Sequence, residues 1–183
     1  MYQKNGILRM PYNVSVKWVA ISGTWRVTNR QVEGDVREAV RQILKNGNGI
    51  VTGGALGVDY FATDEAIICD PSCANLKIFL PVPIKLYFRH YRQRALEEVI
   101  TFEQAENLIL QLMWVRDANH KAIIENKKNT IVDKTTYFER NQSVIDASDE
   151  LYAFQVNNSE GVGDTINKAK AKGIPIKKFI YTV

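Results

Sequence analysis

Residues 50–59, IVTGGALGVD, decide the fold of this chain. The first three have the apolar, β-branched character of a short buried strand, and this strand runs directly into a glycine loop. A helical pattern, residues 58–68, begins where the loop ends. A strand, a glycine loop and a helix in this order indicate an α/β unit whose loop amides and helix N-terminus can hold an anion.

We expect the amides of this loop to bind a ligand phosphate, because glycine lets N–H groups turn toward one point and lets an oxygen approach closely. The residues assigned to this role are Gly53, Gly54, Ala55 and Gly57. The loop matches neither the dinucleotide fingerprint nor the P-loop, whose Lys-Ser/Thr it lacks. Two alternatives stay open: a tight turn whose glycines serve packing, and an Asp59 that caps the helix instead of accepting a ligand hydroxyl.

Strands and helices alternate on both sides of this stretch. Short apolar or alternating segments predict further strands at residues 16–22, 76–80, 150–156 and 176–181. Apolar residues at helical spacing predict helices over residues 32–44, 136–147 and 162–172. This alternation implies an α/β fold with three layers, a Rossmann-like, mostly parallel sheet with helices on both faces.

The middle of the chain departs from that alternation, and we assign residues 84–130 to a helical insertion. One apolar stripe there predicts a core-facing helix, with a partner-binding face as the alternative. The stripe consists of Phe102, Ala105, Leu108, Ile109, Leu112 and Met113, widened by Trp114. The polar, lysine-rich residues 126–134 are expected to form a surface loop and not a binding motif.

Length and composition bound the class of protein. At 183 residues we expect a single domain over 1–183, with residues 1–13 as an N-terminal tail that lacks the apolar stretch of a secretory signal. No apolar run approaches the roughly 20 residues needed to cross a bilayer, so we expect a cytoplasmic protein with no membrane partner. A net charge of +4 is compatible with anionic ligands. The few cysteines and histidines lack the paired spacing of a zinc site, so we expect no metal.

A second glycine element, residues 159–165 (SEGVGDT), again lies between a predicted strand and a predicted helix. The carboxyl ends of parallel strands meet at one edge of the sheet, where open α/β sheets bind ligands. We therefore expect three groups of residues to line one cleft. They are Ser22, Gly23 and Thr24 after the first strand, Gly161, Gly163 and Thr165 of this second element, and Arg140 and Asn141 in the preceding helix.

Cations alternate with aromatic residues over residues 85–94, KLYFRHYRQR. Lysine and arginine neutralise phosphates and aromatic rings stack on bases, so weak nucleic-acid binding through Lys85, Arg89, Arg92 and Arg94 is one interpretation. The favoured interpretation is a helix with one aromatic face in the core and one basic face in water.

Taken together, these motifs resemble the SLOG superfamily, which includes the DNA-processing protein A family, the YpsA-like proteins and the LONELY GUY phosphoribohydrolases. The resemblance covers about residues 16–181 outside the helical insertion, and its most specific part is the first glycine loop with Asp59. It implies a Rossmann-like fold that binds nucleotides or nucleotide-derived ligands across the strand ends. By resemblance, phosphate contacts fall on both glycine elements, and Ser22, Gly23 and Arg140 line the same cleft.

One departure from the phosphoribohydrolases bears on catalysis. In those enzymes the second loop carries an acidic residue that works with the helix arginine. At the matching position of this chain, two residues after Thr165, stands Asn167. Asparagine cannot act as a general base, and Asp164 is the remaining carboxylate candidate beside Arg140. We therefore expect a homo-oligomeric sensor or carrier of a nucleotide-type ligand, with no other cofactor. The alternatives are a nucleotide N-glycosidic hydrolase and a single-stranded nucleic-acid-binding protein.

Overall fold

A computed structural model describes residues 15–183, so the predicted tail at residues 1–13 lies outside the described residues. Six strands form one sheet in the order β4-β3-β2-β1-β5-β6, and every pair is parallel. The strands are β1 Trp18–Gly23, β2 Gly49–Thr52, β3 Leu76–Leu80, β4 Ile123–Glu125, β5 Glu150–Val156 and β6 Ile176–Tyr181. The order reverses between β1 and β5, which creates a topological switch point there.

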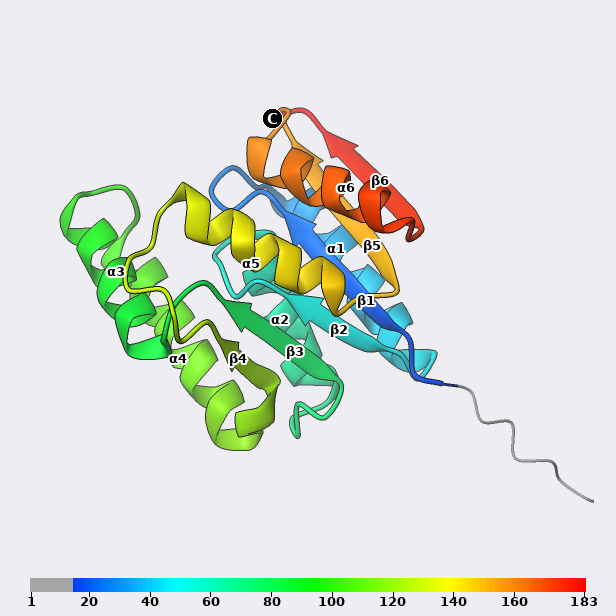
Figure 1. Ribbon diagram of the computed structural model, residues 1–183, viewed down its shortest axis with the longest axis horizontal. Coiled ribbons are helices and arrows are strands. Elements are labelled where there is room, and N and C mark those ends of the chain that lie inside the picture. The colour runs from blue at the N-terminus through cyan, green and yellow to red at the C-terminus, as the bar shows by residue number, and fades with distance from the viewer. Residues whose placement is uncertain (1–14) are drawn as a thin grey trace, which may run out of the picture.

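Helices cover both faces of this sheet, which confirms the predicted α/β architecture (Figure 1). The helices are α1 Arg30–Lys45, α2 Val58–Cys69, α3 Ile84–Leu96, α4 Phe102–Ala118, α5 Lys134–Asp146 and α6 Glu160–Lys172. Helices α5 and α6 lie together on one face, and α1 and α2 lie on the other (Figure 1). The α3–α4 pair packs beside the β3–β4 side of the sheet, with α4 against α2.

Strand alternation divides the core into two layers. Val19 and Ile21 of β1 pack with the buried faces of α1, α2 and α4, whereas Ala20 packs with those of α5 and α6. Adjacent strand residues point to opposite faces, so both faces of a central strand must be apolar when helices cover both. The continuous apolar pattern of the strands therefore follows directly from the three layers.

Local signals start and stop the helices. The Asn29 side chain accepts the Val32 N–H at 3.0 Å and caps α1. Helix α4 begins with a capping box between Thr101 and Gln104, which satisfies donors that an α-helix otherwise leaves without acceptors. Among residues 15–183, no helix is long and apolar enough to span a membrane.

Residues 84–130 contain a strand that the sequence analysis missed. Helices α3 and α4 are present as expected, but β4 follows them and pairs with β3 at Ile78, Phe79 and Leu80. Three residues are too few to show a period of two, so β4 had no recognisable signal.

The predicted stripe on α4 is correct at its centre and wrong at its margin. Ala105, Leu108, Ile109 and Leu112 are buried, but Phe102 is 57% exposed and Met113 is 36% exposed. Helix α4 lies beside the edge of the sheet, where neighbouring elements cover only part of its circumference. The buried arc of α4 is therefore narrower than the apolar stripe that predicted it.

Candidate functional site

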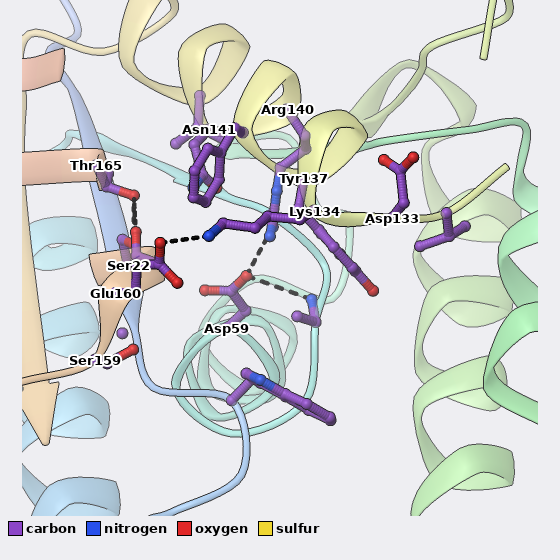
Figure 2. A pocket seen from close by; sticks show the side chains of 18 of the residues that line it. Ser22, Asp59, Asp133, Lys134, Tyr137, Arg140, Asn141, Ser159, Glu160 and Thr165 are labelled. Atoms are coloured by element: carbon purple, nitrogen blue, oxygen red, sulfur yellow. Dashed lines mark hydrogen bonds and ion pairs between the residues drawn. The ribbon is translucent and has the colours of Figure 1, made fainter. Parts of the chain in front are cut away.

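A cavity of about 510 Å³ opens at the carboxyl ends of β1 and β2, next to the switch point between β1 and β5. Helices α5 and α6 and part of α3 complete its walls (Figure 2). Nine residues expected in the cleft line this cavity: Ser22, Gly23, Gly53, Ala55, Asp59, Arg140, Asn141, Gly161 and Thr165. Five others expected there do not line it: Thr24, Gly54, Gly57, Gly163 and Asp164. Ligand contact by any of them stays a prediction.

The floor of the cavity is an ion pair between Arg140 of α5 and Asp59 of α2. Arg140 Nη1 donates to Asp59 Oδ2 at 3.1 Å, and the two side chains are 10% and 8% exposed (Figure 2). Burial raises the pKa of Asp59, while Arg140 and two loop amides oppose that rise. An isolated buried carboxylate or guanidinium would be costly, so each group requires the other.

Gly53 is the residue that admits this arginine. A Cβ at Gly53 would lie 1.1 Å from Arg140 Nη1, so any side chain would expel the guanidinium. The absence of a side chain at Gly53 therefore positions Arg140 directly above the end of β2.

The anion held by the first glycine loop is the protein's own Asp59. Its carboxylate accepts the Ala55 N–H at 3.3 Å, and the Gly53 amide also stabilises its charged form. These are two of the amides expected to bind a ligand phosphate. Asp59 therefore acts within the loop, as an acceptor for backbone and arginine.

Gly54 and Gly57 give the first glycine loop its conformation and its close packing. Both have positive φ, +63° and +68°. A Cβ at Gly54 would meet the buried Ile78 at 2.7 Å, and one at Gly57 would meet the Thr24 carbonyl at 2.4 Å. Glycine is required at both positions for backbone conformation and close packing. This agrees with the alternative stated from the sequence, a tight turn whose glycines serve packing.

Thr24 joins the strand ends without lining the cavity. Its hydroxyl accepts the Val156 N–H at 3.2 Å, and its carbonyl accepts the Val58 N–H at 3.2 Å. Thr24 thereby fixes the end of β1 to the end of β5 and to the start of α2.

The first turn of α6 forms the opposite wall. Ser22 Oγ donates to Thr165 Oγ1 at 3.3 Å, and Thr165 Oγ1 donates to the Gly161 carbonyl at 3.0 Å. Within residues 15–183, the side chain of the N-cap residue Ser159 accepts no hydrogen bond from this turn. The first N–H groups of a helix have no intrahelical acceptor, so this wall presents donors and a partial positive charge.

Asp164, the carboxylate proposed as a catalytic candidate, is engaged elsewhere. It accepts Asn141 Nδ2 at 3.0 Å and forms an ion pair with Lys168. These contacts join α5 to α6. Arg140 is instead paired with Asp59, so the structure does not bring the two candidate catalytic residues together.

Sequence reasoning missed the aromatic part of the cavity. Tyr137 and Phe138 of α5 line it one turn before Arg140, and His90 and Tyr91 enter from α3. The other lining residues, which were not expected in the cleft, are Ile21, Trp25, Arg94, Val132, Asp133, Lys134, Val144, Ser159 and Glu160. Residues 132 and 133 lie in a loop as expected, Lys134 begins α5, and all three also line the cavity. The Tyr-Phe pair preceding Arg140 was the one available signal.

The basic segment is helix α3, as favoured. Tyr87 and Tyr91 are buried, and burial raises the pKa of both hydroxyls. Exposed Arg92 pairs with Glu106 at 2.8 Å, and Arg94, which also lines the cavity, pairs with Glu97 at 2.8 Å. Acidic partners therefore interrupt the basic face.

Ionisable side chains at the mouth also occur in pairs. Lys134 Nζ of α5 lies 2.5 Å from Glu160 Oε1 of α6, and Figure 2 shows Lys134 extending toward Glu160. Burial and Arg94 lower the pKa of His90, so its imidazole is neutral at neutral pH.

Within residues 15–183, no group of three or more His, Cys, Asp or Glu side chains could hold a metal ion.

Comparisons with known proteins give the fold. No protein-family model and no curated protein matches the sequence. Among solved structures, DNA processing protein A from Helicobacter pylori matches with a TM-score of 0.63 and 22% identity, covering 88% of this chain. This chain spans 64% of that protein, which binds single-stranded DNA.

Two further structures have lower scores. The molybdenum cofactor carrier protein from Chlamydomonas reinhardtii has a TM-score of 0.52 and 15% identity, covering 89% of this chain and 75% of the carrier. TM1055 has a TM-score of 0.51 and 14% identity, covering 88% of this chain and 72% of its own. The Rossmann-like α/β fold expected from the sequence is confirmed, and at these identities the likeness concerns the fold alone.

Proposed function

We propose that this chain, with its SLOG-type Rossmann-like fold, binds a nucleotide or a nucleotide-derived phosphate in the cavity at the strand ends. One observation carries the proposal: the first turn of α6 and an aromatic wall from α3 and α5 face the same 510 Å³ cavity. A helix N-terminus suits a phosphate, and aromatic side chains suit a planar base. The volume falls within the range of pockets that bind small molecules, about 300–1,000 Å³.

The phosphate is placed at α6 and not at the first glycine loop. Asp59 already occupies amides of that loop, and Arg140 is already neutralised by Asp59. At α6, Gly161 lines the cavity, and a Cβ there would meet nothing within 4 Å. Open space beside unsatisfied helix N–H groups is the arrangement that a phosphoryl group needs.

The base is placed against the aromatic wall. Tyr137 stands between His90, with ring centroids 6.4 Å apart, and the Arg140 guanidinium, 5.4 Å from its ring. Burial raises the pKa of Tyr137, so its hydroxyl remains protonated at neutral pH. A heterocycle here would meet ring faces together with hydroxyl and imidazole groups that can form hydrogen bonds.

Substituting two glycines of α6 tests this placement. Gly161→Val adds bulk beside the proposed phosphate, whereas Gly163→Val is a matched control, because a Cβ at either glycine meets nothing within 4 Å and only Gly161 lines the cavity. In calorimetry with AMP, Gly161→Val should weaken binding by about tenfold to a hundredfold, the loss expected for charge-assisted hydrogen bonds. Gly163→Val should bind AMP like the wild type, because Gly163 does not line the cavity and the phosphate contact implied for it by resemblance is not part of the proposed site.

Equal affinities for the two variants would contradict the phosphate position. Failure of the wild type to bind AMP and the other common nucleoside monophosphates would contradict the proposed function itself. Far-UV circular dichroism of both variants keeps a loss of binding distinct from a loss of fold.

A hydrolytic function is the second candidate, and the Asp59–Arg140 pair is the observation that favours it. A carboxylate lies 3.1 Å from the arginine inside the cavity, and its pKa is raised. Asp59 is nevertheless committed to Arg140 and to loop amides, which disfavours it as a general base. We therefore expect no release of free base when nucleoside monophosphates are incubated with the protein. Release abolished by Asp59→Asn would instead establish the enzyme.

Single-stranded nucleic acid is an alternative ligand for the mouth of the same cavity. Trp25 lies at this mouth, 36% exposed, with the Arg26 guanidinium 4.7 Å from its ring. An exposed tryptophan beside a cation can stack on a base while the cation neutralises a phosphate. DNA processing protein A, which has a similar fold, binds single-stranded DNA, and this supports the alternative.

A further inference from the structure

The charged side chains that line the cavity cancel one another. Among residues 15–183, three are cationic and three are anionic, so their formal sum is zero at neutral pH: Arg94, Lys134 and Arg140 against Asp59, Asp133 and Glu160. His90 adds no charge there, because burial and Arg94 lower its pKa. A cavity with no net side-chain charge offers little compensation for a ligand with several negative charges.

Each of the three cations already has a carboxylate partner. Arg140 is paired with Asp59 at 3.1 Å, Lys134 with Glu160 at 2.5 Å, and Arg94 with Glu97 at 2.8 Å. A ligand with several phosphates would have to take these cations from their partners. The N-terminus of α6 also contributes partial positive charge, and a Cβ at Gly161 beside it would meet nothing within 4 Å.

Glu160 is the carboxylate nearest in sequence to the proposed phosphate position. It is the first residue of α6, adjacent to Gly161, and its side chain lines the cavity while remaining 72% exposed. Lys134 is 64% exposed, and such exposed ion pairs contribute little to stability, so an incoming ligand can separate them. The Glu160 charge remains at the mouth whether or not Lys134 is paired with it.

We propose that Glu160 determines ligand specificity by charge, so that the cavity accepts a singly phosphorylated ligand and discriminates against diphosphates and triphosphates. The proposal rests on the proposed nucleotide function. A second or third phosphate extending from the α6 N-terminus toward the mouth meets the Glu160 carboxylate and a Lys134 that this carboxylate already neutralises. Repulsion grows with each added charge, because the Coulomb energy is proportional to the product of the charges and low salt limits its screening.

The experiment measures the affinities of AMP, ADP and ATP by calorimetry, in low salt and without divalent cations, for wild type and for Glu160→Gln. The wild type should bind AMP most tightly and lose roughly three- to tenfold in affinity for each added phosphate. In Glu160→Gln the difference between AMP and ATP should largely disappear, chiefly because ATP binds more tightly. The matched control is Glu103→Gln, which removes a first-turn carboxylate from α4, outside the cavity, and should keep the wild-type order.

The outcomes separate this proposal from the proposed function. If the wild type binds AMP but Glu160→Gln keeps the wild-type ratio of AMP to ATP affinity, charge selection by Glu160 is overturned and nucleotide binding stands. If none of the three nucleotides binds to the wild type, both proposals fail. In Lys134→Met/Glu160→Gln, continued loss of discrimination shows that Glu160 acts through its own charge, whereas restored discrimination would overturn that role.

Discussion

At the scale of single residues, the site depends on a glycine that makes room for an arginine. Gly53 leaves the space that the Arg140 guanidinium occupies, and Arg140 neutralises the buried Asp59. The Arg140 Nε atom is buried without a hydrogen-bond partner among residues 15–183, so the guanidinium is held chiefly by Asp59 and by the ring of Tyr137. The Asp59–Arg140 ion pair therefore stabilises the fold, and any contact of Arg140 with a ligand depends on that pair remaining intact.

Arg140→Met should lower the free energy of unfolding by about 3–5 kcal/mol near neutral pH, because it leaves a buried carboxylate without its partner. Burial already raises the pKa of Asp59, and loss of Arg140 removes the main opposing influence. An acid whose folded-state pKa is raised stabilises the fold at low pH and loses that contribution as pH rises from its unfolded pKa through its folded pKa. Urea denaturation should therefore show a smaller loss at about pH 5 than at about pH 8.

The double variant Asp59→Asn/Arg140→Met removes both charges and supplies the control. It should be more stable than Arg140→Met at the higher pH and should lack the additional pH dependence. A single variant as stable as the wild type at both pH values would show that the pair is not required for folding.

At the scale of elements, α5 carries much of the site and is fixed at both ends. Asp133 and Thr136 form a capping box at its start, with Asp133 Oδ1 accepting the Thr136 N–H at 2.8 Å. At its end, Lys172 Nζ of α6 donates to the carbonyls of Ile145, Asp146 and Ser148 at 2.8, 2.9 and 2.6 Å. The cavity residues that α5 holds in place are Lys134, Tyr137, Phe138, Arg140, Asn141 and Val144.

Asp133→Ala should lower the free energy of unfolding by about 1 kcal/mol, the usual loss when a side-chain N-cap is removed. Thr101→Ala removes the corresponding cap of α4 and should be destabilising by a similar amount. Denaturant titration measures both losses, and calorimetry with AMP distinguishes the variants. Only Asp133→Ala should change affinity, because the first turn of α5 lines the cavity. An equal change of affinity in both variants would indicate a general loss of stability instead.

At the scale of the whole molecule, the parallel sheet brings strand ends, the N-termini of α2, α5 and α6 and part of α3 to one cavity. The chain has a net charge of +4, but acidic side chains pair with many of its lysines and arginines, as they do with Arg92 and Arg94 of α3. A continuous basic surface is therefore not formed by α3, and long-range attraction of a polyanion should be modest.

Binding of labelled oligothymidine should accordingly be weak and salt-dependent, with affinity falling roughly tenfold between about 50 and about 200 mM salt, as expected for two or three phosphate contacts. Fluorescence anisotropy should show similar affinity for other base compositions. Trp25→Ala should weaken this binding, because base stacking is lost at the cavity mouth. Trp114→Ala is the control, since Trp114 is 55% exposed on α4 and lies outside the cavity lining. Binding that is tight, specific for one sequence and insensitive to Trp25 would contradict this prediction.

The sequence by itself determined the alternation of strands and helices, because apolar periodicity and glycine loops are local properties of the chain. It also indicated which strand ends would meet, since parallel strands place their carboxyl ends at one edge. Gly53, Gly161 and Arg140 could be named as candidates on that basis. The three-residue strand β4 could not, because it is too short to carry a periodic signal.

Tertiary structure alone decided what those residues face. Nothing local indicates that Gly53 admits Arg140 or that Lys134 meets Glu160 across the cavity mouth. These partners are far apart along the chain, and their contacts depend on how the helices pack across the sheet. The aromatic wall has the same origin, because α3 and α5 each bury one face and only their packing brings Tyr91 and Tyr137 to one cavity. Local pattern fixes the elements, whereas long-range packing fixes the charge balance and shape of the site.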